Sequence, residues 1–166
     1  PLTALNPLHT VQKQIGEILR IHRGLNGKPA TTRIIELLGL VGIPDPASRL
    51  GAYPHQLSGG QRQRVMIAMA LANEPDILIA DEPTTALDVT IQKQVLLLLQ
   101  ELQQKLGMTV LLITHDLGVV RRYAHRVGVM TRGKLVEVAD SEVLFTNPQH
   151  AYTRALLDAE PKGLPV

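Results

Sequence analysis

Residues 77–83 read Ile77-Leu78-Ile79-Ala80-Asp81-Glu82-Pro83, a short apolar run that ends in two carboxylates and a proline. A continuous apolar run that follows a turn at 73–76 predicts a buried strand. Open α/β sheets bind ligands at the carboxyl ends of their strands, so both carboxylates are predicted at a ligand-binding edge. There Asp81 can hold Mg²⁺ through its water shell, and Glu82 can orient or deprotonate an attacking water in phosphoryl transfer. The alternative is that both are loop residues that cap the next segment.

A second apolar run at 110–114 predicts another buried strand, and it leads into Thr114-His115-Asp116. A histidine at this edge can donate a hydrogen bond to a γ-phosphate. Alternatively, His115 is structural and Asp116 caps the helix expected over about 117–124. The functional interpretation is favoured because His115 follows its strand as the acidic pair follows the first one.

Upstream, Leu57-Ser58-Gly59-Gly60-Gln61 lies where a proline-containing loop enters a helix predicted over 61–72. Glycines let backbone N–H groups approach a ligand, and a helix start favours an anion, so this stretch is a candidate phosphate clamp. The alternative is a capping box, in which Ser58 and Gln61 stabilise the helix start. The two interpretations are compatible.

The remaining patterns alternate helices with strands, which indicates an α/β layered core with a mainly parallel sheet and flanking helices, plus an α-helical subdomain. A hairpin of 127–131 and 135–138 is expected around Arg132-Gly133, and Asn147-Pro148 is expected as N-cap and first residue of a final helix to about Leu157. Apolar residues predict two amphipathic helices near the start and one long helix that ends at Gly107: Val11, Ile15, Ile18 and Leu19; Ile34, Leu37, Leu38 and Val41; Ile91, Val95, Leu98, Leu99, Leu102 and Leu106.

The composition excludes several classes of protein. The 166 residues suit one domain, and 45% hydrophobic residues are enough for a buried core. A net charge of +2 does not indicate a nucleic-acid-binding face, and the absence of cysteine excludes disulfides and thiolate metal sites. The longest apolar run, 65–72, is too short to span a membrane. Because the chain begins at Pro1 with no signal-peptide pattern, we expect it to be cut from a longer protein.

The order of these motifs resembles that of the nucleotide-binding domain of ATP-binding cassette (ABC) ATPases, which have a P-loop NTPase-like core. Residues 57–61, continued by Arg62-Gln63-Arg64-Val65, resemble the family's signature loop. Residues 77–83 resemble the Walker B strand with its catalytic glutamate. Ala86-Leu87-Asp88 resembles the D-loop, and His115 the switch histidine.

This resemblance implies ATP and Mg²⁺ as cofactors. Asp81 would help to hold Mg²⁺, Glu82 would activate water and His115 would contact the γ-phosphate. Because the family closes two nucleotide-binding domains head to tail, Asp88 would communicate across their interface. The signature residues would touch the ATP held by the opposite protomer: Ser58, Gly59, Gly60 and Gln61.

The two ends of the chain also resemble parts of this family. Residues 2–7 are similar to the segment after the glutamine loop of peptide-type importers, and the helices up to Ala52 to the helical subdomain that contacts the membrane subunits. Residues 147–157 are similar to the tail of oligopeptide and dipeptide importers, except that Ala151 stands where that branch usually has proline. We therefore expect a helical subdomain at 1–56, part of the ATPase core at 57–139 and an importer-type tail at 140–166.

The P-loop of this family is not found in the 166 residues. Residues 128–135 match its glycine and lysine spacing, but Leu135 replaces the hydroxyl residue and the stretch is predicted as strand, turn and strand. Since the family's P-loop, adenine-stacking residue and glutamine-loop glutamine precede the equivalent of Pro1, we expect no ATP hydrolysis by this chain alone.

The resemblance favours the ATPase subunit of a peptide-type importer, held peripherally at the cytoplasmic face of the plasma (inner) membrane. It implies membrane permease subunits, a second nucleotide-binding domain and, indirectly, a substrate-binding protein as partners, and no nucleic acid is expected. Peptides, metal chelates and glutathione-like compounds remain open as the solute. The alternatives are a soluble ABC ATPase that acts in DNA repair or translation, and a non-catalytic remnant of the fold.

Overall fold

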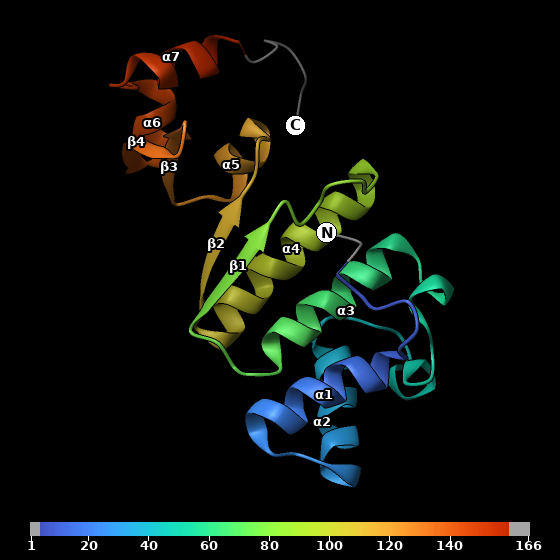
Figure 1. Ribbon diagram of the computed structural model, residues 1–166. Coiled ribbons are helices and arrows are strands. Elements are labelled where there is room, and N and C mark those ends of the chain that lie inside the picture. The colour runs from blue at the N-terminus through green and yellow to red at the C-terminus, as the bar shows by residue number, and fades with distance from the viewer. Residues whose placement is uncertain (1–3, 160–166) are drawn as a thin grey trace. The chain divides into compact units, whose positions relative to one another are not determined.

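The computed structural model describes residues 4–159, and the chain divides into two compact units, one up to Ile113 and one from Thr114. The first unit holds four helices, two short 3₁₀ turns and a parallel strand pair (Figure 1): α1 (Val11–Arg23), α2 (Gly27–Leu40), η1 (Pro46–Arg49), η2 (Pro54–Gln56), α3 (Gly59–Leu71), β1 (Ile77–Asp81), α4 (Val89–Leu106) and β2 (Thr109–Ile113). The second unit holds α5 (Leu117–Tyr123), β3 (Arg126–Thr131), β4 (Lys134–Asp140), α6 (Ser141–Thr146) and α7 (Ala151–Asp158).

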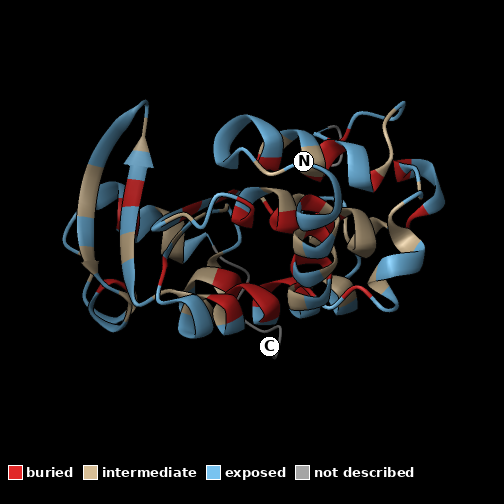
Figure 2. Cartoon of the chain, turned by 90° about the horizontal axis from the view of Figure 1, so that it is seen from below, coloured by how far each residue is buried: buried red, intermediate tan, exposed pale blue. Residues whose placement is uncertain are grey.

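Helices α1 and α2 are the two amphipathic helices that the sequence predicts, and they pack against each other and against α3. Their inward residues, among them Ile15, Leu19 and Ile34, are almost completely buried, and Figure 2 shows such buried positions where the helices face one another. Helix α2 begins at Gly27, earlier than its apolar pattern, with Pro29 in its first turn. Proline is tolerated there because the N–H groups of a first turn have no partner within the helix.

A buried glutamine braces the segment that precedes α1. The Oε1 atom of Gln14 accepts a hydrogen bond from the Asn6 N–H at 2.9 Å. Its Nε2 atom donates to the carbonyl oxygens of Asn6, at 3.2 Å, and His9, at 2.9 Å. Because buried polar groups are costly unless they are paired, these bonds hold residues 6–9 in one conformation.

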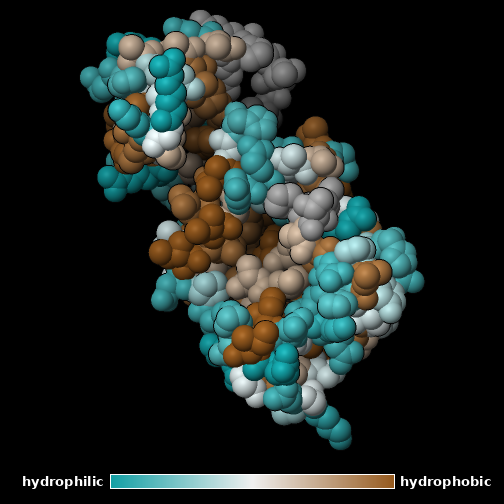
Figure 3. Space-filling model, viewed as in Figure 1, coloured by the Kyte–Doolittle hydropathy of each residue, from teal (hydrophilic) through white to brown (hydrophobic). Residues whose placement is uncertain are grey.

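Strands β1 and β2 are parallel, as predicted, with Ile77 opposite Thr109 and Asp81 opposite Ile113. The prediction that both are buried strands is wrong for one face of this sheet. Ile77 and Ile79 are 60% and 62% exposed, whereas Leu78 is buried. The physical reason is that side chains alternate across a strand, and the described residues cover one face of the pair. Figure 3 shows the resulting hydrophobic surface over β1 and β2, to which Leu111 and Ile113 also contribute.

Helix α4 has the long apolar face that the sequence predicts. It starts at Asp88, whose Oδ1 atom accepts a hydrogen bond from the Ile91 N–H at 3.0 Å, and it ends at Gly107. Leu97 and Leu106 are 39% and 46% exposed, whereas the valine and the other leucines of its centre are buried: Val95, Leu96, Leu98, Leu99 and Leu102. The helix contacts α3 and β2, so it joins the helical part of the unit to the sheet.

In the second unit, β3 and β4 form the predicted antiparallel hairpin, with Thr131 opposite Lys134. The intervening Arg132 and Gly133 have φ values of 49° and 73°. Two residues of positive φ are what a two-residue hairpin turn of the right twist requires. The rejected P-loop candidate at 128–135 therefore is a strand, a turn and the start of a second strand.

The prediction for the end of the chain needs a correction. Asn147 and Pro148 are not the N-cap and first residue of the last helix, because residues 141–146 already form α6, and the Asn147 N–H donates to the Val143 carbonyl oxygen at its end. Helix α7 begins at Ala151, where the His150 side chain accepts from the Tyr152 N–H. Ala151 is thus a first helical residue, a position that also suits proline.

Glu137 on β4 holds the start of α7. Its carboxylate accepts hydrogen bonds from the N–H groups of Gln149, at 2.7 Å, and His150, at 2.9 Å. The pKa of Glu137 is lowered below its ordinary value of 4.5, chiefly by the Gln149 N–H, with the His150 N–H acting in the same sense. Hydrogen bonds to the charged form favour that form.

None of the described helices is both long and apolar enough to cross a membrane.

We expect Glu137→Gln to lower the protection of the Gln149 and His150 amides against hydrogen exchange at neutral pH, since a side-chain amide offers one acceptor oxygen in place of two. The folded pKa of Glu137 is lowered, so its contribution to stability is present above pH 4.5 and is lost as the pH falls through the folded pKa. Protection of the unmodified chain should therefore approach that of the variant in acid. Glu142→Gln on α6 is the control, and equal protection of the two variants at neutral pH would contradict this role of Glu137.

Candidate functional site

Asp81 and Glu82 lie at the carboxyl end of β1, as predicted. Asp81 is the last residue of the strand and is exposed. The Glu82 N–H donates to the Ile113 carbonyl oxygen at 2.9 Å, which extends the pairing with β2 by one residue. Glu82 has a φ of 49°, a left-handed conformation that is unfavourable for a residue with a side chain. The chain therefore turns out of the sheet at this residue, held by its bond to β2.

The Glu82 carboxylate is oriented from within the same turn. The Thr85 hydroxyl donates to Glu82 Oε2 at 2.6 Å, and the Thr85 N–H donates to the Glu82 carbonyl oxygen at 3.2 Å. Short hydrogen bonds to a charged acceptor are stronger than neutral ones. The turn thus fixes the direction of a half-buried carboxylate at the end of a strand, which is the arrangement that a general base or a water-orienting group needs.

Asp88 follows this turn and has a local structural task, because its side chain caps α4 through the Ile91 N–H. Ala86, between Glu82 and Asp88, also has a positive φ, of 64°. The segment 82–88 is therefore a folded connection with defined hydrogen bonds at both of its ends. Asp81, Glu82 and Asp88 therefore lie along the turn that leads from the last residue of β1 to the N-cap of α4.

At residues 57–61, the capping-box alternative is confirmed. Ser58 Oγ accepts from the Gln61 N–H at 3.2 Å, and Gln61 Oε1 accepts from the Ser58 N–H at 3.0 Å. Ser58 is exposed and Gln61 is half-buried. A role of this loop in phosphate binding stays a prediction, and it is compatible with the cap because the Ser58 hydroxyl still has a proton to donate.

The glycines of this loop also have a structural reason that the sequence analysis missed. A Cβ atom on Gly60 would lie 2.8 Å from Ile91 Cγ2 on α4, and one on Gly59 would lie 3.4 Å from Leu87 Cδ2. The loop at 57–61 and the 86–88 segment therefore touch at the start of α4. Local sequence carries no signal for this contact, because the partners are about thirty residues apart in the chain.

His115 belongs to the second unit and is exposed, two residues beyond the end of β2. The neighbouring Asp116 caps α5, as the alternative proposed: its Oδ1 atom accepts from the Val119 N–H at 3.0 Å. Its own N–H donates to Thr114 Oγ1 at 3.1 Å. The cap defines the backbone on the carboxyl side of His115, whose catalytic role stays a prediction.

The residues fit a metal that arrives with a nucleotide. Between residues 4 and 159, no group of three or more His, Asp or Glu side chains is placed to hold a metal ion. Mg²⁺ in phosphoryl-transfer sites typically takes one or two carboxylates and completes its shell with phosphates and water. The single exposed carboxylate of Asp81 is suited to such a shared site.

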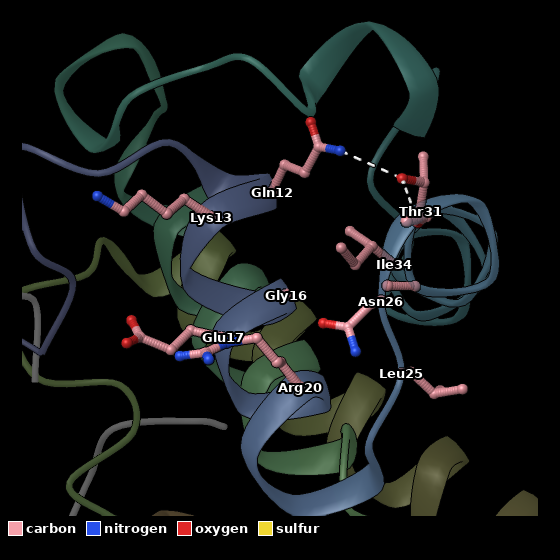
Figure 4. A pocket seen from close by; sticks show the side chains of 11 residues that line it. Gln12, Lys13, Gly16, Glu17, Arg20, Leu25, Asn26, Thr31 and Ile34 are labelled. Carbon is pink, nitrogen blue, oxygen red and sulfur yellow. Dashed lines mark hydrogen bonds between the residues drawn. The ribbon is translucent and has the colours of Figure 1, made fainter.

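A pocket of about 330 Å³ lies elsewhere, between α1 and α2 (Figure 4). Gln12 on α1 donates a hydrogen bond to the Thr31 hydroxyl on α2 across it, at 3.2 Å. Lys13, Glu17 and Arg20 also line it, and none of the predicted site residues does. The candidate site is therefore an open strand edge and helix start, not this pocket.

Comparison with known proteins agrees with the fold. The ABC transporter family model matches residues 2–85, and the chain belongs to this family. A peptidoglycan transport ATP-binding protein of Agrobacterium fabrum is 65% identical over 165 residues. Dipeptide transport ATP-binding proteins of Bacillus subtilis and Escherichia coli are 57% and 58% identical over 162 residues.

These relatives are longer than the chain. The match covers 99% of this chain and 30% of the Agrobacterium protein, and 98% of this chain and 48% of the Bacillus protein. A solved dimeric ATP-binding cassette in a post-hydrolysis state, bound to ADP and Pi, aligns with a TM-score of 0.69 and 34% identity over 83% of this chain and 59% of that one. The mixed helical and parallel-sheet fold is therefore that of part of an ABC cassette.

We expect Gly60→Ala to be destabilising in the native background by about 1–2 kcal/mol, since overpacking against Ile91 outweighs the gain in helix propensity. In an Ile91→Ala background the same change should be neutral or stabilising, because the obstructing methyl group is gone. Urea denaturation of the four proteins measures this coupling. Gly51→Ala, where nothing lies within 4 Å of a Cβ atom, is the control. Additive effects at positions 60 and 91 would contradict the close contact.

Proposed function

We propose that the full-length protein containing this chain is the ATP-hydrolysing subunit of an ABC importer for peptides or related small solutes. The observation that carries the proposal is sequence similarity to dipeptide transport ATP-binding proteins, which match 98% of this chain at 57–58% identity. The acidic pair at the end of β1 supports it, because that pair suits the chemistry of phosphoryl transfer.

In this proposal Asp81 takes part in holding Mg²⁺ and Glu82 acts on the attacking water. Bound Mg-ATP supplies the reactive phosphoanhydride and part of the charge neutralisation. The Thr85 hydroxyl keeps Glu82 oriented, so that the carboxylate can accept a proton from water or align it. His115 donates a hydrogen bond to the γ-phosphate, which stabilises charge that develops there.

The loop at 57–61 acts on the nucleotide of a second nucleotide-binding domain. Its exposed serine and the N-terminal N–H groups of α3 are suited to an anion. Asp88 lies next to Leu87, which contacts Gly59 of that loop. Asp88 therefore couples the nucleotide site of one domain to that of the other. The solved cassette named above as a dimer supports such a pairing.

In this proposal, each part of the chain has its own role. Residues 1–56 contact the membrane permease subunits, residues 57–139 form part of the nucleotide-binding core, and residues 140–166 form an importer-type tail. The protein would act at the cytoplasmic face of the membrane through these permease subunits, with a substrate-binding protein as an indirect partner.

Reconstitution of the full-length protein with its permease subunits in vesicles tests the proposal. ATP-dependent uptake of dipeptides supports it, and co-purification with ribosomes or DNA in place of permease subunits would overturn it.

We expect Glu82→Gln in the full-length protein to lower ATP turnover by about 10²–10⁴-fold while ATP affinity changes little, because the variant loses the general base but keeps the shape of the side chain. Steady-state turnover and equilibrium nucleotide binding separate the two effects. Glu101→Gln, an exposed carboxylate on α4, is the matched control. Undiminished turnover in Glu82→Gln would show that the role is misassigned.

A further inference from the structure

We propose that Arg64 is a positioning residue for the loop at 57–61, because its guanidinium ties α3 to the carboxyl end of α2. The inference rests on the proposed function, in which this loop reaches the ATP of a second nucleotide-binding domain. The inference adds to that function the residue that positions the loop, Arg64.

The contact itself is short and joins distant parts of the chain. Arg64 Nη1 donates to the Val41 carbonyl oxygen at 2.6 Å, in a half-buried setting. Val41 is the C-cap residue of α2, where the terminal carbonyl groups lack partners within the helix and carry a partial negative charge. A cation that donates a hydrogen bond at this end is favoured on both counts.

The backbone at the end of α2 is shaped to admit the guanidinium. Gly42 has a φ of 73°, and the N–H groups of Gly42 and Ile43 donate to the carbonyl oxygens of Gly39 and Leu38, both at 2.9 Å. A Cβ atom on Gly42 would lie 2.8 Å from Arg64 Nη1. The space left by the missing side chain is therefore the space that the arginine uses.

A second link between the helical pair and the end of α3 is weaker. Glu74 pairs with Arg23 at 2.9 Å and with Arg33 at 3.1 Å, but the side chains of Arg23 and Glu74 are 40% and 55% exposed. Exposed pairs of this kind are screened by salt and contribute little. At physiological ionic strength, solvent and salt therefore weaken the hydrogen bond between Arg64 and Val41 less than the ion pairs of Glu74.

Arg64 also lies close along α3 to the contact with α4. Gly60 packs against Ile91 one turn before Arg64 reaches Val41, so the start of α3 is held between α4 and α2. Loss of the guanidinium leaves the Ser58–Gln61 capping box and the buried face of α3 intact, but it removes the polar contact that fixes the first turns of α3 against the end of α2. The expected defect is therefore in contact with the partner's nucleotide and not in binding of ATP to the protein's own site.

The experiment uses the full-length protein in a Glu82→Gln background, in which ATP-bound dimers should accumulate. We expect Arg64→Met to weaken ATP-dependent dimer formation by about tenfold or more, with ATP affinity of the monomer unchanged within about twofold. Arg64→Lys should recover part of the loss, because it keeps a charged donor but not the planar fork. Arg20→Met, on the exposed face of α1, is the control. Sedimentation velocity and nucleotide-binding titrations give the two readouts.

Gly42→Ala provides a second variant should Arg64→Met fail to fold, because it displaces the guanidinium without removing it. Gly42→Ala by itself should also weaken ATP-dependent dimer formation, because a Cβ atom there would lie 2.8 Å from Arg64 Nη1. Dimer formation by Arg64→Met equal to that of Arg20→Met would overturn the inference, and so, if Arg64→Met does not fold, would dimer formation by Gly42→Ala equal to that of Arg20→Met. A parent protein that binds no ATP would instead contradict the proposed function, so the two failures are distinguishable.

Discussion

Close packing around α3 is the constraint on which the first compact unit depends. The buried face of this helix, with Val65, Ala68 and Leu71, lies in the same core as α1, α2 and α4. At its start, the side-chain-free surface of Gly60 admits Ile91 of α4. The helix that begins at the loop at 57–61 is therefore also the central packing element, and small displacements of it are transmitted to all of its neighbours because protein interiors are close-packed.

The strand pair supplies the second constraint, since parallel pairing brings two strand ends to the same edge. Asp81 lies opposite Ile113, and the bond from the Glu82 N–H continues the ladder beyond the strand. The unfavourable backbone conformation of Glu82 is thus held by a hydrogen bond to a neighbouring strand. The opposite, exposed face of the same strands is apolar, so the described residues cover the sheet from one side.

Several candidate site residues have a structural and a proposed chemical role at once. Ser58 and Gln61 close a capping box, and Asp88 caps α4. These roles do not compete, because a cap uses one acceptor and leaves the remaining donor or lone pairs available. The caps also fix the positions of these side chains, since a residue that caps a helix is held in place by that helix. The proposed nucleotide contacts are in this way placed on rigid elements rather than on free loops.

The sequence by itself determined the features that depend on neighbours within a few residues: the helix caps at Ser58 and Asp116, the hairpin turn at 132–133, and the carboxylates that follow β1. Only the tertiary structure decided which face of β1 is covered, that residues 141–146 form a helix of their own, and that Gly60 and Gly42 make room for Ile91 and Arg64. The physical reason is the separation in the sequence between the residues that interact. A cap or a turn is satisfied by hydrogen bonds that local sequence contains, whereas steric fit and the covering of a sheet involve residues that only folding brings together.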